Sequence, residues 1–146
     1  DHFKKVNDTY GHLVGDQVIR ALAQVLQNNV KGRDIAARWG GEEFIVLLPE
    51  TPGEGAVMLA EQVRVAFGKT RIKSGGKQQV SDGVTISIGV AEIASGEPLE
   101  QAVGRADSAL YTAKNGGRNC VRVAPPAGPA GAGRSDGEGE PVAAAR

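Results

Sequence analysis

Apolar residues recur at helical spacing in three stretches of the chain. Each stripe repeats at intervals of three and four residues, which places its members on one face of a helix. The stripes are Val18, Leu22, Val25 and Leu26; Ala56, Leu59, Ala60, Val63 and Phe67; and Leu99, Ala102, Val103, Ala106, Ala109, Leu110 and Ala113. They predict three helices with core-facing sides. The first would span about residues 15–30, and the third would end at Gly116-Gly117.

Four shorter segments have the composition of strands. Residues 34–39 and 44–48 flank a pair of glycines, 84–93 is rich in β-branched side chains, and 119–123 closes the pattern. The predicted order is helix, β-hairpin, helix, strand, helix, strand. This order predicts an α/β (α+β) domain with a mixed central sheet flanked by helices.

Gly40 and Gly41 stand between the two arms of the predicted hairpin. A Gly-Gly pair is a type I′ or II′ turn signal, because both residues tolerate positive φ. The turn would place Glu42 and Glu43 at a rim of the sheet, where successive side chains face opposite ways. The bare glycines would also let a phosphate or ribose approach the backbone. From turn chemistry alone, an ordinary solvated turn with two surface glutamates is the simpler interpretation.

Composition narrows the function classes. The chain has 146 residues, enough for one domain with a core, and its 17 basic and 17 acidic residues give zero net charge. This balance argues against a nucleic-acid partner held by bulk positive charge. The single cysteine, Cys120, excludes an internal disulfide or a cysteine metal cage, and we interpret it as a small core residue. We find no apolar run of membrane-spanning length and no signal peptide, and we expect a cytoplasmic location.

The chain divides into a domain over residues 1–124 and a tail over 125–146. Fifteen of the 22 tail residues are Pro, Gly or Ala, and the only larger aliphatic residue is Val142. Such a segment buries too little apolar surface to offset its ordering entropy. We therefore predict a disordered tail without a catalytic role.

Three motifs, in this order, resemble those of one known family. They are residues 1–16 (DHFKKVNDTYGHLVGD), 40–44 (GGEEF) and 105–119 (RADSALYTAKNGGRN). Together they resemble the GGDEF family, the diguanylate cyclases, in its GGEEF form. The resemblance runs from residue 1 to about residue 123. It implies a palm-like nucleotide cyclase fold, again with a mixed sheet.

The start of the chain departs from the family pattern. The family usually reads Asp-x-Asp-x-Phe-Lys there, and Asp1 matches the second aspartate. The resemblance therefore implies that the first aspartate, a metal ligand, and the central strand that carries it are missing from this chain. Neighbouring strands would then expose unpaired backbone groups, and this fragment of a longer polypeptide could be inactive.

The resemblance also implies a reaction. Diguanylate cyclases join two GTP molecules into cyclic di-GMP and release two pyrophosphates, with Mg²⁺ or Mn²⁺ as the cofactor. They work as homodimers, because each site holds half of the reaction. Glu42 matches the metal-binding acid, which is also a proposed base, and Glu43 is expected to support the site. A solvated turn residue remains the alternative for Glu43.

Further residues match the nucleotide contacts of the family. Asn7 and Asp16 match the residues that read guanine, and Lys114 and Arg118 match phosphate-binding cations. The other implied substrate contacts are Phe3, Lys4, His12, Gly40 and Gly41. Simpler roles stay open: a favourable charge near a helix end for Asp16 and for the two cations, and a structural histidine at position 12. We assign Lys5, Asp8 and Asp107 to structure.

A product-inhibition site is degenerate in this chain. Many family members carry Arg-x-x-Asp before the hairpin, whereas this chain has Lys31 and Asp34 at those positions. Lysine lacks the planar fork with which arginine grips guanine or phosphate. We therefore expect weak or absent product inhibition, and Arg33, one position away, cannot be assumed to substitute.

Two other functions compete with catalysis. The chain could be an inactive GGDEF module that binds GTP or cyclic di-GMP as a regulatory element. A palm-like cyclase that uses ATP is disfavoured by Asn7 and Asp16, and no Glu-Ala-Leu phosphodiesterase motif is present. An upstream sensor or receiver domain on the same polypeptide is expected in either case.

Overall fold

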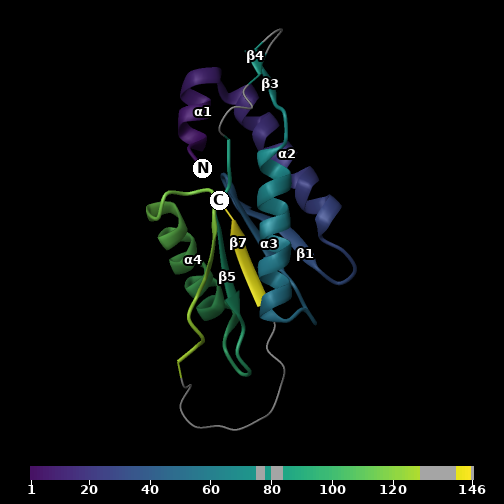
Figure 1. The fold of residues 1–146 in the computed structure, drawn as a ribbon, viewed down its shortest axis with the longest axis vertical. Helices are drawn as coiled ribbons and strands as arrows, with labels where there is room; N and C mark the ends of the chain where they lie inside the picture. Colours follow the sequence, from purple (N-terminus) through teal and green to yellow (C-terminus); the bar gives the residue numbers. More distant parts are fainter. Residues whose placement is uncertain (75–77, 80–83, 129–140, 146) are drawn as a thin grey trace.

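The computed structural model describes residues 1–74, 78–79, 84–128 and 141–145, which form helices around a central sheet (Figure 1). The helices are α1 (Phe3–Tyr10), α2 (His12–Asn29), α3 (Gly53–Gly68) and α4 (Leu99–Asn115). The strands are β1 (Ile35–Gly40), β2 (Glu43–Leu47), β3 (Lys73–Ser74), β4 (Gln78–Gln79), β5 (Ile88–Glu92), β6 (Val121–Val123) and β7 (Pro141–Ala145). The predicted helices and strands are all found, with shifted ends, whereas α1, β3, β4 and β7 were not predicted.

The main sheet has the order β1-β2-β7-β5-β6. Its β5–β6 pair is parallel and the other pairs are antiparallel, so the predicted mixed sheet is confirmed. Strands β3 and β4 form a separate two-stranded sheet. Helices α2 and α3 cover one face of the main sheet, and α4 covers the other (Figure 1).

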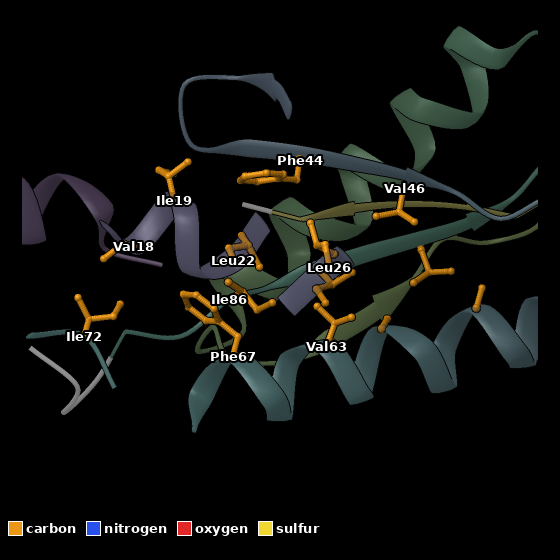
Figure 2. Close-up of a cluster of buried hydrophobic side chains, with 14 of the residues drawn as sticks. Val18, Ile19, Leu22, Leu26, Phe44, Val46, Val63, Phe67, Ile72 and Ile86 are labelled. Atoms are coloured by element: carbon orange, nitrogen blue, oxygen red, sulfur yellow. The ribbon is translucent and has the colours of Figure 1, made fainter. Parts of the chain in front are cut away.

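Alternation along the strands supplies both faces of the sheet with apolar side chains. Phe44 and Val46 of β2 join the large cluster formed with α2 and α3, which Figure 2 shows in close-up. Ile45, between them, packs with Ala102 of α4. Small side chains let α4 approach closely: a Cβ on Gly89 of β5 would lie 2.0 Å from the carbonyl oxygen of Ala106.

Part of the segment that was predicted as a disordered tail lies in the centre of the sheet. Pro141–Ala145 form β7, which pairs antiparallel with β2 on one side and β5 on the other. The prediction of disorder is therefore wrong for these five residues; residues 129–140 and 146 lie outside the described part of the chain. That prediction weighed only side-chain burial. A strand between two others satisfies its backbone N–H and C=O groups on both edges, which even alanines can do.

The hairpin turn also differs from its prediction. Gly40 pairs with Glu43, so Gly41 and Glu42 form the turn. Gly41 has a φ of 47°, and the register shifts between Arg38 and Gly40. The side chain of Arg38 closes the turn, because its Nε donates a hydrogen bond to the carbonyl oxygen of Gly41 at 2.9 Å. Glu42 is thereby held inside the turn.

Two smaller predictions are also tested. Cys120 is free and half-buried, so it lies at the edge of the core. Among the described residues, every helix is too short or too polar to cross a lipid bilayer.

Candidate active site

A pocket lies where the hairpin turn, the start of α1 and the segment before β5 meet. Two ionisable residues, Asp1 and Glu42, line it together with Phe3. The remaining lining residues are Val18, Ile19, Leu22, Phe67, Val84, Thr85 and Ile86. The pocket therefore pairs an apolar wall with two carboxyl groups from distant parts of the sequence.

Asp1 is fixed by hydrogen bonds on both carboxylate oxygens. The Ser87 hydroxyl donates to Oδ1 at 2.8 Å, and the Thr85 hydroxyl donates to Oδ2 at 2.8 Å. The backbone N–H of Asn119 also donates to Oδ2, at 3.2 Å. Asp1 is only 8% exposed, and its terminal nitrogen donates to the carbonyl oxygen of Thr85 at 2.7 Å. These bonds occupy Asp1 structurally rather than leaving it open to a ligand.

Charges of both signs surround this residue. Burial lowers the pKa of the Asp1 α-ammonium group to about 6. The positive charge of Lys114 and, less strongly, that of Arg118 lower this pKa further, while the negative charge of Glu42 opposes them. The predicted acid of the hairpin and the two predicted phosphate-binding cations therefore all lie close enough to Asp1 to affect this pKa.

Arg118 lies in a tight corner after α4. Arg118 and Asn119 both have left-handed backbone conformations, with φ of 62° and 47°. The backbone N–H of Arg118 donates to the carbonyl oxygen of Ala113 at 3.0 Å. The guanidinium of Arg118 is exposed and has no partner among residues 1–74, 78–79, 84–128 and 141–145. Such a group is available to an anion.

Asn7 presents an unsatisfied acceptor. Its side-chain oxygen is buried and has no hydrogen-bond donor within the described part of the chain. It lies against Gly15 of α2, where a Cβ would come within 1.9 Å of it. Asp16, the other residue predicted to read guanine, follows Gly15 and is exposed. A buried acceptor without a donor is energetically unfavourable.

The two hairpin glutamates have different surroundings. Glu42 lies in the turn, is half-buried and lines the pocket. Glu43 is the first residue of β2, pairs with Gly40 and has an interaction of its own. The alternative of a freely solvated turn residue therefore does not describe Glu43.

Of the thirteen predicted site residues, Phe3 and Glu42 line the pocket, and the other eleven are not among its lining residues. Lys4 and His12 are exposed on α1 and at the start of α2. Lys31 and Asp34 lie in the connection from α2 to β1, where the Lys31 backbone N–H donates to Asp34 Oδ2 at 3.4 Å. Their assigned roles stay predictions.

The described residues do not complete a metal site by themselves. Nowhere in the described ranges do three or more His, Cys, Asp or Glu residues gather where they could hold an ion. Asp1 already accepts three hydrogen bonds, so Glu42 is the one pocket carboxylate left for a cation. We therefore derive no chemical step through a metal.

Sequence reasoning missed the residues that hold Asp1. Thr85 and Ser87 were assigned to a strand without a role, and Asn119 was treated only as part of a motif. A signal was present: two hydroxyl residues at a spacing of two face the same side of a strand otherwise rich in β-branched apolar residues.

Comparison with known proteins agrees with this geometry. A family model described as "Diguanylate cyclase, GGDEF domain" matches residues 1–120. The chain is 45% identical over 124 residues to diguanylate cyclase DgcM of Escherichia coli (strain K12), covering 85% of this chain and 29% of that protein. It is 46% identical over 121 residues to diguanylate cyclase VdcA of Vibrio cholerae, covering 83% of this chain and 36% of that protein. The chain thus spans much less than half of these relatives.

Solved structures give the same result at the level of the fold. The GGDEF domain of DgcB from Caulobacter crescentus, in complex with c-di-GMP, matches with a TM-score of 0.80 and 39% identity. That match covers 84% of this chain and 72% of the DgcB chain. The active GGEEF domain of a diguanylate cyclase from Vibrio cholerae matches with a TM-score of 0.75 and 33% identity, covering 87% of this chain and 79% of that one. With its turn, its sheet and residues 1–120 all accounted for, the chain belongs to the GGDEF family of diguanylate cyclase domains.

Proposed function

We propose that this domain condenses two GTP molecules into cyclic di-GMP and releases two pyrophosphates. The observation that carries the proposal is that Glu42 lines one pocket with the buried Asp1, which is hydrogen-bonded to Asn119, the residue after Arg118. A carboxylate that can take a proton and cations that can hold phosphates are the groups this reaction needs. The names of the relatives and the cyclic di-GMP bound to the DgcB domain support the same chemistry.

The proposed step is an attack by the 3′-hydroxyl oxygen of one GTP on the α-phosphorus of the other. A phosphorus–oxygen ester bond forms, the bond to the β-phosphate bridge breaks, and pyrophosphate leaves with the electron pair. Glu42 accepts the hydroxyl proton, from its place in the tight turn beside the pocket. Two such bonds close the ring, so a second copy of the domain has to present its own GTP face to face.

We assign the recognition of the two ends of GTP to different elements. Arg118 and Lys114 hold the triphosphate, with the planar guanidinium of Arg118 able to make two parallel hydrogen bonds. Asn7 and Asp16 read guanine, with their side-chain oxygens as acceptors for guanine N1–H and the 2-amino group. Adenine has neither of these donors, so it would leave the oxygens unpaired.

The cofactor and the setting are proposals of the same kind. We propose that the reaction depends on Mg²⁺ or Mn²⁺, with Glu42 as one oxygen ligand. We also propose a cytoplasmic domain that works as a homodimer under an upstream sensor or receiver domain. A chain that spans 29% of DgcM leaves room in such relatives for other domains.

Weak product inhibition also remains a proposal. Arg33 is engaged elsewhere, because its Nη1 lies 2.6 Å from Glu50 Oε1 in an exposed ion pair. This ion pair supports the expectation that Arg33 does not take the place of the family's arginine, for which this chain has Lys31. Titration of an active dimer with cyclic di-GMP measures this directly, and strong inhibition at micromolar product would contradict it.

An inactive module that binds GTP or cyclic di-GMP is the alternative, which relatives named as diguanylate cyclases do not favour. Incubation with GTP and Mg²⁺, followed by chromatography for cyclic di-GMP, separates the two functions. We would assay this chain beside a form extended before Asp1, with Glu42→Gln of each as the matched control. Product that disappears in Glu42→Gln supports the cyclase. GTP binding without product supports the regulatory module, and the absence of both refutes the proposed function.

A further inference from the structure

Asp1 is a buried acid that the proposed chemistry does not use. It is 8% exposed, and its neighbour Ser87 is fully buried. A carboxylate in such a place is costly unless hydrogen bonds satisfy its oxygens. Three donors do so here, and they come from two segments that are 84 and 118 residues away along the chain. Asp1 therefore ties the segment before β5 to the corner after α4.

The corner that Asp1 holds is conformationally unfavourable by itself. Arg118 and Asn119 are consecutive non-glycine residues with left-handed backbones, a conformation that is unfavourable for residues with a Cβ. Contacts on three sides hold the corner in place. Arg118 N–H bonds to Ala113, Asn119 N–H bonds to Asp1, and the Asn119 side-chain oxygen accepts from Arg64 Nη1 at 2.8 Å.

The backbone of this corner determines the position from which the Arg118 side chain extends. That side chain is exposed and has no partner in the described ranges. We propose that Asp1 is a positioning residue: by accepting the Asn119 N–H, it holds the Arg118–Asn119 corner so that Arg118 meets the triphosphate of the nucleotide. The role assigned to Arg118 rests on the proposed function, whereas the Asp1–Asn119 contact does not.

A comparison of two substitutions tests this role. Asp1→Ala removes the acceptor and keeps the terminal nitrogen bonded to Thr85. Asp1→Asn keeps an oxygen for the Asn119 N–H, while the Ser87 hydroxyl can turn to accept from the new amide. We expect Asp1→Ala to weaken GTP binding about 10-fold, as one lost hydrogen bond to a charged group would. Asp1→Asn should restore most of that affinity, because the acceptor and not its charge is required.

Two ligands distinguish positioning from general damage to the fold. Calorimetric titration with GMP, which has no β- or γ-phosphate, should give the same affinity for wild type and Asp1→Ala. The double variant Asp1→Ala/Arg118→Ala should bind GTP no more weakly than Arg118→Ala, because both substitutions remove the same contact. Equal losses for GTP and GMP, or losses that add in the double variant, would overturn the proposal.

Hydrogen exchange keeps the contact testable if no nucleotide binds. The Asn119 amide should be protected in the wild-type chain and in Asp1→Asn, and should exchange much faster in Asp1→Ala. If Asp1→Ala does not fold, Thr85→Val takes its place. It removes the hydroxyl that donates to Asp1 Oδ2, the acceptor of the Asn119 N–H, and should therefore accelerate exchange of the Asn119 amide. Protection unchanged by loss of the acceptor overturns the proposal. Failure of GTP to bind to any variant, with this protection pattern intact, refutes the proposed function alone.

Discussion

Replacing Gly15 by alanine should displace the side chain that we assign to guanine while leaving α2 intact. A Cβ at this position would lie 1.9 Å from Asn7 Oδ1 and 3.2 Å from Phe3 Cζ. Real Cβ atoms keep at least 3.0 Å from such neighbours, so the oxygen would have to move by about 1.1 Å. The helix itself needs no change, because alanine fits its backbone better than glycine does.

Stability and binding should therefore change in opposite directions. Alanine in place of a helical glycine gains about 1 kcal/mol, from which the movement of Asn7 subtracts a part. Loss of the Asn7 acceptor leaves a guanine donor unpaired, which costs about 1–3 kcal/mol, or about 5–150-fold in GTP affinity. A substitution that merely damaged the fold would lower both quantities together.

Calorimetric titrations with GTP and ATP, combined with urea unfolding, measure the two effects. Gly104→Ala is the matched control, because Gly104 lies in α4 and its Cβ would meet nothing within 4 Å. It should gain about 1 kcal/mol of stability and bind both nucleotides as wild type does. If Gly15→Ala kept the wild-type preference for GTP over ATP, the seating of Asn7 against Gly15 would have no part in recognition.

Three further predictions concern the sheet and its supports. Gly89→Ala should cost about 3 kcal/mol or more in urea unfolding, because its Cβ would lie 2.0 Å from the Ala106 carbonyl oxygen; unchanged stability would contradict this close approach. The hydrogen bonds from Arg105 lower the pKa of Glu97, so this pair should stabilise the fold above pH 4.5 and progressively less as pH falls through the lowered value. Glu97→Gln should cost about 3 kcal/mol at pH 7 and flatten the acid limb of the stability profile, and a parallel profile would refute the assignment. Ala144→Pro should remove a donor of β7 and distort this central strand, so hydrogen exchange of β2 and β5 should rise; unchanged exchange would contradict the pairing of β7 with both strands.

Periodicity sufficed for the elements that pack through side chains. The stripe from Leu99 to Ala113 predicted α4, whose observed span is Leu99–Asn115. It could not reveal α1, which buries one residue, Val6, and so leaves no stripe to detect. It could not reveal β7 either, because that strand is held by backbone pairing, which leaves no hydrophobic pattern in the sequence of its five residues.

The residues of the site could be predicted only where a sequence motif contains them. Glu42 was expected at the rim of the sheet, and it lines the pocket, though inside the turn rather than after it. The anchoring of Asp1 by Ser87 and Asn119 depends on contacts between residues 86 and 118 positions apart, which no local pattern encodes. Sequence therefore indicated which groups carry charge, and tertiary structure determined which of them remain open to a ligand.

The place of β7 in the sheet also determines the width of the site. The turn with Glu42 comes just before β2, whereas Asp1 bonds to the residues just before β5, and β7 lies between these two strands. Neighbouring strands lie about 4.8 Å apart, so one strand between β2 and β5 keeps them about 10 Å apart. Direct pairing of β2 with β5 would halve that separation and close the pocket between Glu42 and Asp1. The central strand is thus a spacer as well as a pairing partner, which is why a segment of small residues is enough to support the geometry that we assign to the reaction.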